Sequence, residues 1–215
     1  MQYLVKVLEH HEANPSLTRL RHPLVVLFHL PFVVFLIGVY VLFTHRTAGQ
    51  TLYFLIAVGL YLSSAAYHAW KPNWFLRFVD QTMISWYVIV IPMPFIYQYA
   101  WAAPLTVLLL VLTAFNKWYE WEPDYTVGTI VFFALGAISA GLVICFGLPA
   151  IEATLRSVPG FWVIVSIVCF IGKLIIYQYR KLHLVPNVWE SPESGHFVLS
   201  LGVTIYTLVI VFYPV

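Results

Sequence analysis

Charged residues are scarce in this sequence: Asp, Glu, Lys and Arg make up only 9% of its 215 residues, whereas 61% are hydrophobic. A soluble domain carries about 25% charged residues, so this composition cannot cover a surface that faces water. A membrane β-barrel is excluded as well, because its strands would alternate polar and apolar residues, and the apolar runs here are long and continuous. The composition therefore predicts an all-α, polytopic membrane protein.

The sequence also lacks the features of disulfide-linked, secreted, retinal-binding and transporter proteins, which excludes these classes. Its two cysteines, Cys145 and Cys169, both lie within apolar runs and are interpreted as small packing residues rather than a disulfide framework. The first residues lack the basic-then-apolar order of a secretory signal, so we expect the first span to direct insertion. No lysine lies between His196 and Val215, where a retinal protein needs one for its Schiff base. No inverted repeat or pair of broken helices indicates a transporter.

The apolar runs predict a bundle of seven transmembrane helices. Each span needs about 20 mostly apolar residues, and connections in helical bundles are about 2–8 residues long. Residues 1–22 are expected to form a cytoplasmic N-terminal segment, and residues 23–215 the seven-transmembrane domain. Pro92 and Pro94 predict a kink in the third span. The expected spans cover about residues 23–44, 51–70, 80–99, 103–119, 125–149, 160–179 and 192–213.

The distribution of basic residues predicts the orientation. Short cytoplasmic loops are enriched in Lys and Arg, and only Arg46 and Arg156 fall on the side that the odd-numbered spans reach. We therefore expect a cytoplasmic N-terminus, a C-terminus outside, and a location in the plasma or inner membrane. The basic residues on the other side are Lys6, Arg19, Arg21, Lys71, Arg77, Lys117, Arg180 and Lys181.

Several polar residues lie at membrane depth, where ionisable groups are costly and usually functional. Ser64 and His68 are four residues apart on the second span, which places them on one helical face. Asp80 is expected to open the third span, and Glu193 and His196 the seventh. The second span ends in the cytoplasm, where the third and seventh begin, so these residues should converge at one leaflet.

The converging residue types suit two different roles. Imidazole and carboxylate groups are zinc ligands, and a bound zinc ion can generate a nucleophile from water at neutral pH. A nearby aspartate could then accept a proton and a serine could stabilise an oxyanion. The same groups could instead simply form hydrogen bonds between helices. His29, in the first span beside Pro31, could line the same cavity or be an ordinary interhelical histidine.

These residues resemble the signatures of the hemolysin III family, which is grouped with the progestin and adipoQ receptors and, more distantly, with the alkaline ceramidases. The family's signatures are S-x-x-x-H, L-D-H, and an H-x-x-x-H that is followed by an apolar run and a glycine. Ser64 and His68 are similar to the first signature, and Asp80 to the second. His196 and Gly202 fit the end of the third. The resemblance follows the order of the spans over most of the chain.

The resemblance implies a zinc cofactor and assigns roles to individual residues. His68 and His196 would be metal ligands, and Asp80 and Ser64 would be the catalytic residues near the bound water. The sequence departs from the family at Pro192, which stands where the last signature has its first histidine, and Gln81 replaces the histidine after Asp80.

Two interpretations of the Pro192 departure remain open. Glu193 could complete a metal site with His68 and His196, because a Glu-x-x-His pair can face into a bundle together and this set suits zinc or iron. Alternatively, Ser191, Pro192 and Glu193 are the cap, first position and first-turn acid of a helix, and the site is a relic without metal.

Two functions are therefore expected. One is a hemolysin III-like metal-dependent hydrolase of lipid amides, or a degenerate relic of one. The other is a non-catalytic, receptor-like or accessory membrane subunit without metal. In both cases the expected partners are membrane lipids and not nucleic acid, and the sequence leaves the oligomeric state open.

Overall fold

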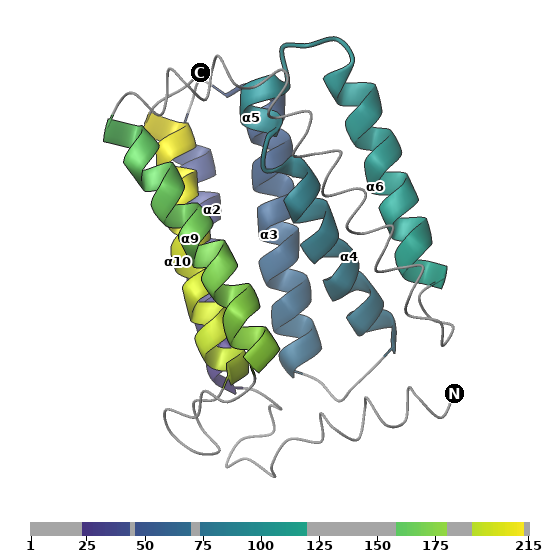
Figure 1. The fold of residues 1–215 in the computed structure, drawn as a ribbon, viewed down its shortest axis with the longest axis vertical. Coiled ribbons are helices and arrows are strands. Elements are labelled where there is room, and N and C mark those ends of the chain that lie inside the picture. The colour runs from purple at the N-terminus through teal and green to yellow at the C-terminus, as the bar shows by residue number, and fades with distance from the viewer. Residues whose placement is uncertain (1–22, 44–45, 70–73, 120–157, 180–190, 213–215) are drawn as a thin grey trace.

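The computed structural model describes residues 23–43, 46–69, 74–119, 158–179 and 191–212, and within these ranges it contains helices and no strand. The predicted all-α class is thus confirmed for this part of the chain (Figure 1). The elements are α2 (Pro23–Leu42), α3 (Ala48–Ala69), α4 (Trp74–Val90), α5 (Met93–Ile96), α6 (Ala102–Tyr119), α9 (Val158–Tyr179) and α10 (Ser191–Phe212).

Four described segments are long and apolar enough to cross a membrane, namely 24–42, 48–69, 74–96 and 194–212. Two shorter apolar stretches, 102–118 and 161–173, lie in α6 and α9. The predicted fifth span at 125–149 and the N-terminal segment lie outside the described residues. The chain is therefore a helical membrane protein, and the number of seven spans remains a prediction.

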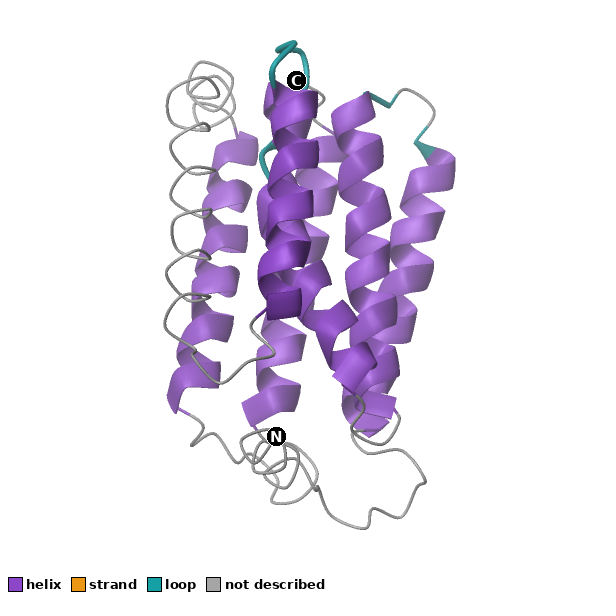
Figure 2. Cartoon of the chain, turned by 90° about the vertical axis from the view of Figure 1, so that its right-hand side faces the viewer, coloured by secondary structure: helices purple, strands orange, loops and turns teal. Residues whose placement is uncertain are grey.

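The helices form a bundle whose long axes run side by side (Figures 1 and 2). Helix α3 contacts α2, α4 and α5, while α10 packs against α9 and α2, and α6 packs against α4. Helices α3 and α9 end, and α4 and α10 begin, at the lower end of the bundle in Figure 1. This arrangement brings residues that are far apart in the sequence into one layer.

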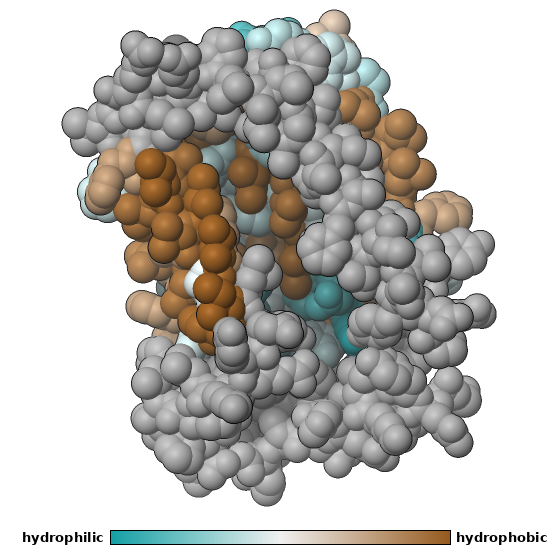
Figure 3. Space-filling view, viewed as in Figure 1, coloured by the Kyte–Doolittle hydropathy of each residue, from teal (hydrophilic) through white to brown (hydrophobic). Residues whose placement is uncertain are grey.

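Both the inward and the outward faces of the helices carry apolar side chains, as expected for a bundle in lipid. The core contains fully buried side chains such as those of Leu36, Phe54 and Tyr61. Large apolar side chains also point outward, including Val34 of α2, which is 70% exposed. In Figure 3, apolar surface covers α9, and hydrophilic surface lies near the lower part of α4. Outward apolar side chains are stable only in contact with lipid or with other apolar helices.

The third span begins earlier than predicted and is interrupted at the predicted prolines. Helix α4 begins at Trp74, so Asp80 lies in its second turn and does not open it. The prediction was wrong because it placed the acid at the boundary, whereas Asp80 is buried among neighbouring helices. At the other end the expected proline break is present: α4 stops at Val90, and Pro92, which has no N–H to donate, precedes the short helix α5.

A buried hydroxyl network joins three helices through the middle of the bundle. The Tyr53 hydroxyl on α3 lies 3.2 Å from the Tyr87 hydroxyl on α4 and 3.0 Å from Thr207 Oγ1 on α10. One turn away, the Gln50 side-chain amide donates to the carbonyl of Ile210 over 3.0 Å. These contacts satisfy polar groups that would otherwise be costly to bury, and they fix the register of α10 against α3.

Close backbone approaches occur where glycine removes the side chain. A Cβ atom at Gly49 would lie 2.4 Å from the carbonyl oxygen of Met93, so α3 and α5 approach backbone to backbone. A Cβ atom at Gly202 would lie 2.9 Å from Cys169 Cβ on α9. Helices α9 and α10 are therefore packed closely along their length, as small residues permit in membranes.

Candidate functional site

Three histidines from three helices lie together at the lower end of the bundle. The rings of His68 on α3 and His196 on α10 have centroids 4.9 Å apart. On its other side, His196 meets His29 of α2, with a centroid distance of 4.8 Å. The predicted convergence of His68 and His196 is therefore observed, and we call these three residues the histidine cluster.

His29 belongs to the cluster although it lies six residues inside α2. Its side chain is only 1% exposed, and its ring meets the Tyr61 ring edge-on at 5.1 Å. Tyr61 stacks in turn on Phe32. The sequence identified His29 as a candidate but could not place it, because the rotation of α2 about its axis depends on the contacts with α3 and α10.

Ser64 lies one turn before His68 on α3 and is almost fully buried. Its hydroxyl makes no hydrogen bond to the described residues. A serine nucleophile needs a hydrogen bond to its general base, and that contact is therefore not made to His68 here. A buried hydroxyl without a partner is instead suited to binding a water molecule or a ligand.

Asp80 is also buried, with 3% of its surface exposed, and it interacts electrostatically with Lys173 of α9. Lys173 interacts with His29 as well. The aliphatic part of Lys173 crosses α10 at Gly195, where a Cβ atom would lie 3.8 Å from the lysine Cγ. Lys173 is thus close enough to influence both Asp80 and His29 electrostatically.

The sequence-based prediction of the site did not include Lys173. The missed signal was its position, because a lysine inside an apolar span marks a functional or paired site. Tyr61 was missed as well, and no sequence pattern distinguishes it from the other tyrosines of the core.

The histidine cluster and Asp80 together offer a set of potential metal ligands. Three imidazoles and a carboxylate have the right chemistry for zinc. However, among the residues whose structure is described, no group of three or more His, Cys, Asp or Glu side chains is arranged to hold a metal ion together. The side chains of Pro192 and Glu193 lie outside the described part, so Glu193 as a ligand remains a prediction. Zinc binding by the histidine cluster therefore stays a prediction as well.

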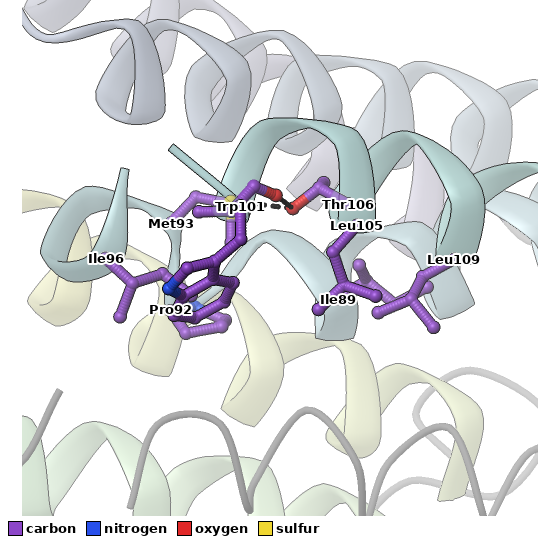
Figure 4. Close-up of a pocket in the computed structure, with 9 residues that line it drawn as sticks. Ile89, Pro92, Met93, Ile96, Trp101, Leu105, Thr106 and Leu109 are labelled. Carbon is purple, nitrogen blue, oxygen red and sulfur yellow. Dashed lines mark hydrogen bonds between the residues drawn. The ribbon is translucent and has the colours of Figure 1, made fainter. Parts of the chain in front are cut away.

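A second feature lies at the opposite end of the bundle, where α4, α5 and α6 meet in a small, mainly apolar pocket (Figure 4). Its one polar side chain, Thr106, donates to the carbonyl of Ala102 and contacts the sulfur of Met93. The hydroxyl is satisfied there, so this pocket is a packing feature. Its lining residues are Ile89, Pro92, Met93, Ile96, Trp101, Ala102, Leu105, Thr106 and Leu109.

Comparisons with known proteins identify no relative: no family model, no curated protein and no solved structure matches the chain. The function is therefore inferred from the residues of the histidine cluster and from the resemblance of their sequence signatures.

Proposed function

We propose that the chain is a hemolysin III-like, seven-span membrane protein with a cytoplasmic N-terminus, and that its histidine cluster binds the polar head of a membrane lipid without hydrolysing it. This is the receptor-like alternative of the two expected functions. The cluster lies at the end of the bundle that the basic residues assign to the cytoplasmic side of the membrane.

The observation that carries the proposal is the buried Ser64 hydroxyl, which makes no hydrogen bond to the described residues. It shares a face of α3 with His68, next to the histidine cluster. A hydroxyl group and imidazole rings together can donate hydrogen bonds to, and accept them from, an amide or a carboxyl group. The apolar outer faces of α2 and α10 offer adjacent surface for the hydrocarbon tails of the same lipid.

Native mass spectrometry of the purified protein tests this proposal. Ceramide and a long-chain fatty acid serve as probes, and phosphatidylcholine serves as the reference lipid. We expect one probe lipid to bind with a stoichiometry of one. Ser64→Ala should weaken that binding about three- to tenfold, which corresponds to one hydrogen bond of about 0.5–1.5 kcal/mol.

Thr113→Val is the matched control, because Thr113 is an equally buried hydroxyl on α6 whose bond goes to its own helix, to the carbonyl of Leu109. It should leave lipid binding unchanged. Equal binding of all three lipids, or equal losses in the two variants, would show that the cluster is not a headgroup site.

A second candidate is the metal-dependent lipid amide hydrolase, and the adjacency of three imidazole rings favours it. Zinc binding would require the rings to reorient or Glu193 to join His68 and His196. Elemental analysis of protein purified without added metal, together with ceramide hydrolysis, distinguishes the two functions. Stoichiometric zinc that is lost in Glu193→Gln, with release of fatty acid, would establish the hydrolase.

A further inference from the structure

Several buried hydroxyl groups in the bundle are satisfied by their own helices. Ser63 donates to the carbonyl of Leu60 over 3.0 Å. Ser166 donates in the same way to the carbonyl of Val163 over 2.7 Å. Such bonds to an earlier carbonyl are common for serine in a helix. Ser200 of α10 differs, because it is completely buried and its hydroxyl makes no hydrogen bond of normal geometry to a described residue.

Two hydroxyl groups on α3, those of Tyr61 and Ser64, share this property. Their side chains are 0% and 2% exposed, and neither hydroxyl makes a hydrogen bond of normal geometry to a described residue. The two residues are separated by one helical turn and therefore lie on the same side of α3. Because a buried hydroxyl without a partner is costly, each of these groups requires a partner from outside the described residues.

The register of α3 against α10 places Tyr61 and Ser200 at nearly the same depth. A hydrogen bond of 3.0 Å joins Tyr53 of α3 to Thr207 of α10, and the two helices run in opposite directions (Figure 1). Tyr61 lies eight residues after Tyr53, and Ser200 lies seven residues before Thr207. Both helices rise about 1.5 Å per residue, so these steps match. The Tyr61 and Ser200 hydroxyls are close enough to interact, yet they are not placed for a direct bond of normal geometry.

Helix α2 encloses the same region from a third side. The His29 ring meets the Tyr61 ring at 5.1 Å and the His196 ring at 4.8 Å. His196 lies one turn before Ser200 on α10. The three hydroxyl groups are therefore enclosed between helices, directly beside the histidine cluster.

We propose that the hydroxyl groups of Tyr61, Ser64 and Ser200 bind buried water between α3 and α10. Water is small enough for a site in which every lining side chain is almost fully buried. A buried water molecule typically makes about three hydrogen bonds to polar groups that lack other partners, and these hydroxyls supply them.

This water site goes beyond the proposed headgroup site and does not depend on it. The two sites meet at Ser64, whose hydroxyl can donate one hydrogen bond and accept another at the same time. Ser64 can therefore bond to the buried water and to a lipid head together. Tyr61 and Ser200 take no part in the proposed lipid binding.

Hydroxyl-radical footprinting of the full-length protein in detergent tests the water site. X-ray pulses convert bound water into radicals that modify the nearest side chains, and mass spectrometry measures the rate for each tyrosine. Tyr61 should be modified several times faster than Tyr53. Tyr53 is the control because it is equally buried on the same helix, but its hydroxyl contacts those of two other helices. Equally slow modification of both tyrosines would overturn the proposal.

A serine variant tests whether α10 contributes to the same site. Ser200→Ala should slow the modification of Tyr61 and leave that of Tyr53 unchanged, because it removes one hydrogen-bonding group from the water. Ser166→Ala is the matched control, since Ser166 is equally buried and bonds to its own helix. A Tyr61 rate that does not respond to Ser200→Ala would overturn the shared site.

Thermal unfolding gives an independent test through the sign of the effect. A hydroxyl that is bonded to water is satisfied, so Tyr61→Phe should lower the melting temperature by about 2–4 °C, the effect of one hydrogen bond in a chain of this length. Removal of a hydroxyl that has no partner at all would instead raise the melting temperature, and a rise would overturn the proposal. Neither test uses a probe lipid, so failure of the proposed lipid function would appear separately, as absent lipid binding in native mass spectrometry.

Discussion

At the scale of single residues, the most informative positions are polar groups that the bundle buries. Tyr53 is fully buried, and its hydroxyl contacts those of Tyr87 and Thr207 on two other helices. In a bilayer, water cannot replace these hydrogen bonds, so the loss of one of them destabilises the folded state.

We expect Tyr53→Phe to lower the free energy of unfolding by about 1 kcal/mol, a typical net value for a hydrogen bond. Tyr40→Phe is the control, because the Tyr40 ring is only half-buried and its hydroxyl is not part of this network. Denaturation in mixed micelles measures both variants. If both variants lose equally little free energy of unfolding, the hydroxyl network does not contribute to stability.

The sequence predicted some residues of the site and not others, for a physical reason. His68 and His196 could be placed because the direction of each span fixes which end carries each residue. Lys173 and His29 could not be placed, because their positions depend on how α9 and α2 are rotated about their axes. That rotation is set by side-chain packing, including the absence of a side chain at Gly195, and no periodic pattern in one sequence reveals it.

At the scale of elements, the sequence predicted the interruption of the third span but not the contact that it creates. The prolines at 92 and 94 predicted a break, and α4 does end before them. They did not predict that the backbone of α5 would lie against the first turn of α3 at Gly49.

This contact yields a prediction for glycine substitutions. A Cβ atom at Gly49 would lie 2.4 Å from the Met93 oxygen and 2.7 Å from Tyr97 Cβ, so Gly49→Ala forces a backbone shift. We expect a loss of about 1–3 kcal/mol, as for other overpacked sites, measured by the same denaturation in micelles.

Gly38→Ala is the matched control in α2, where nothing lies within 4 Å of the new Cβ atom. Alanine is the better helix former, so this variant should gain about 0.5–1 kcal/mol. A Gly49→Ala protein as stable as Gly38→Ala would show that α5 does not pack tightly on α3.

At the scale of the whole molecule, the hypothesis concerns the number and direction of spans. Seven spans with a cytoplasmic N-terminus require loops that alternate between the two sides of the membrane. Reporter fusions at Arg46, Lys71, Lys117 and Arg156 should therefore report outside, inside, inside and outside, because excess Lys and Arg are retained in the cytoplasm. A cytoplasmic signal at Arg46 would reverse the orientation and move the histidine cluster to the outer leaflet.

The interaction of Asp80 with Lys173 has a consequence for how the protein is made. Translation delivers α4 to the membrane well before α9, so the buried acid first enters the bilayer without the lysine. Assembly inside the insertion machinery should therefore wait for α9, and a nascent chain that stops short of it would be recognised by cellular quality control as an unfinished protein.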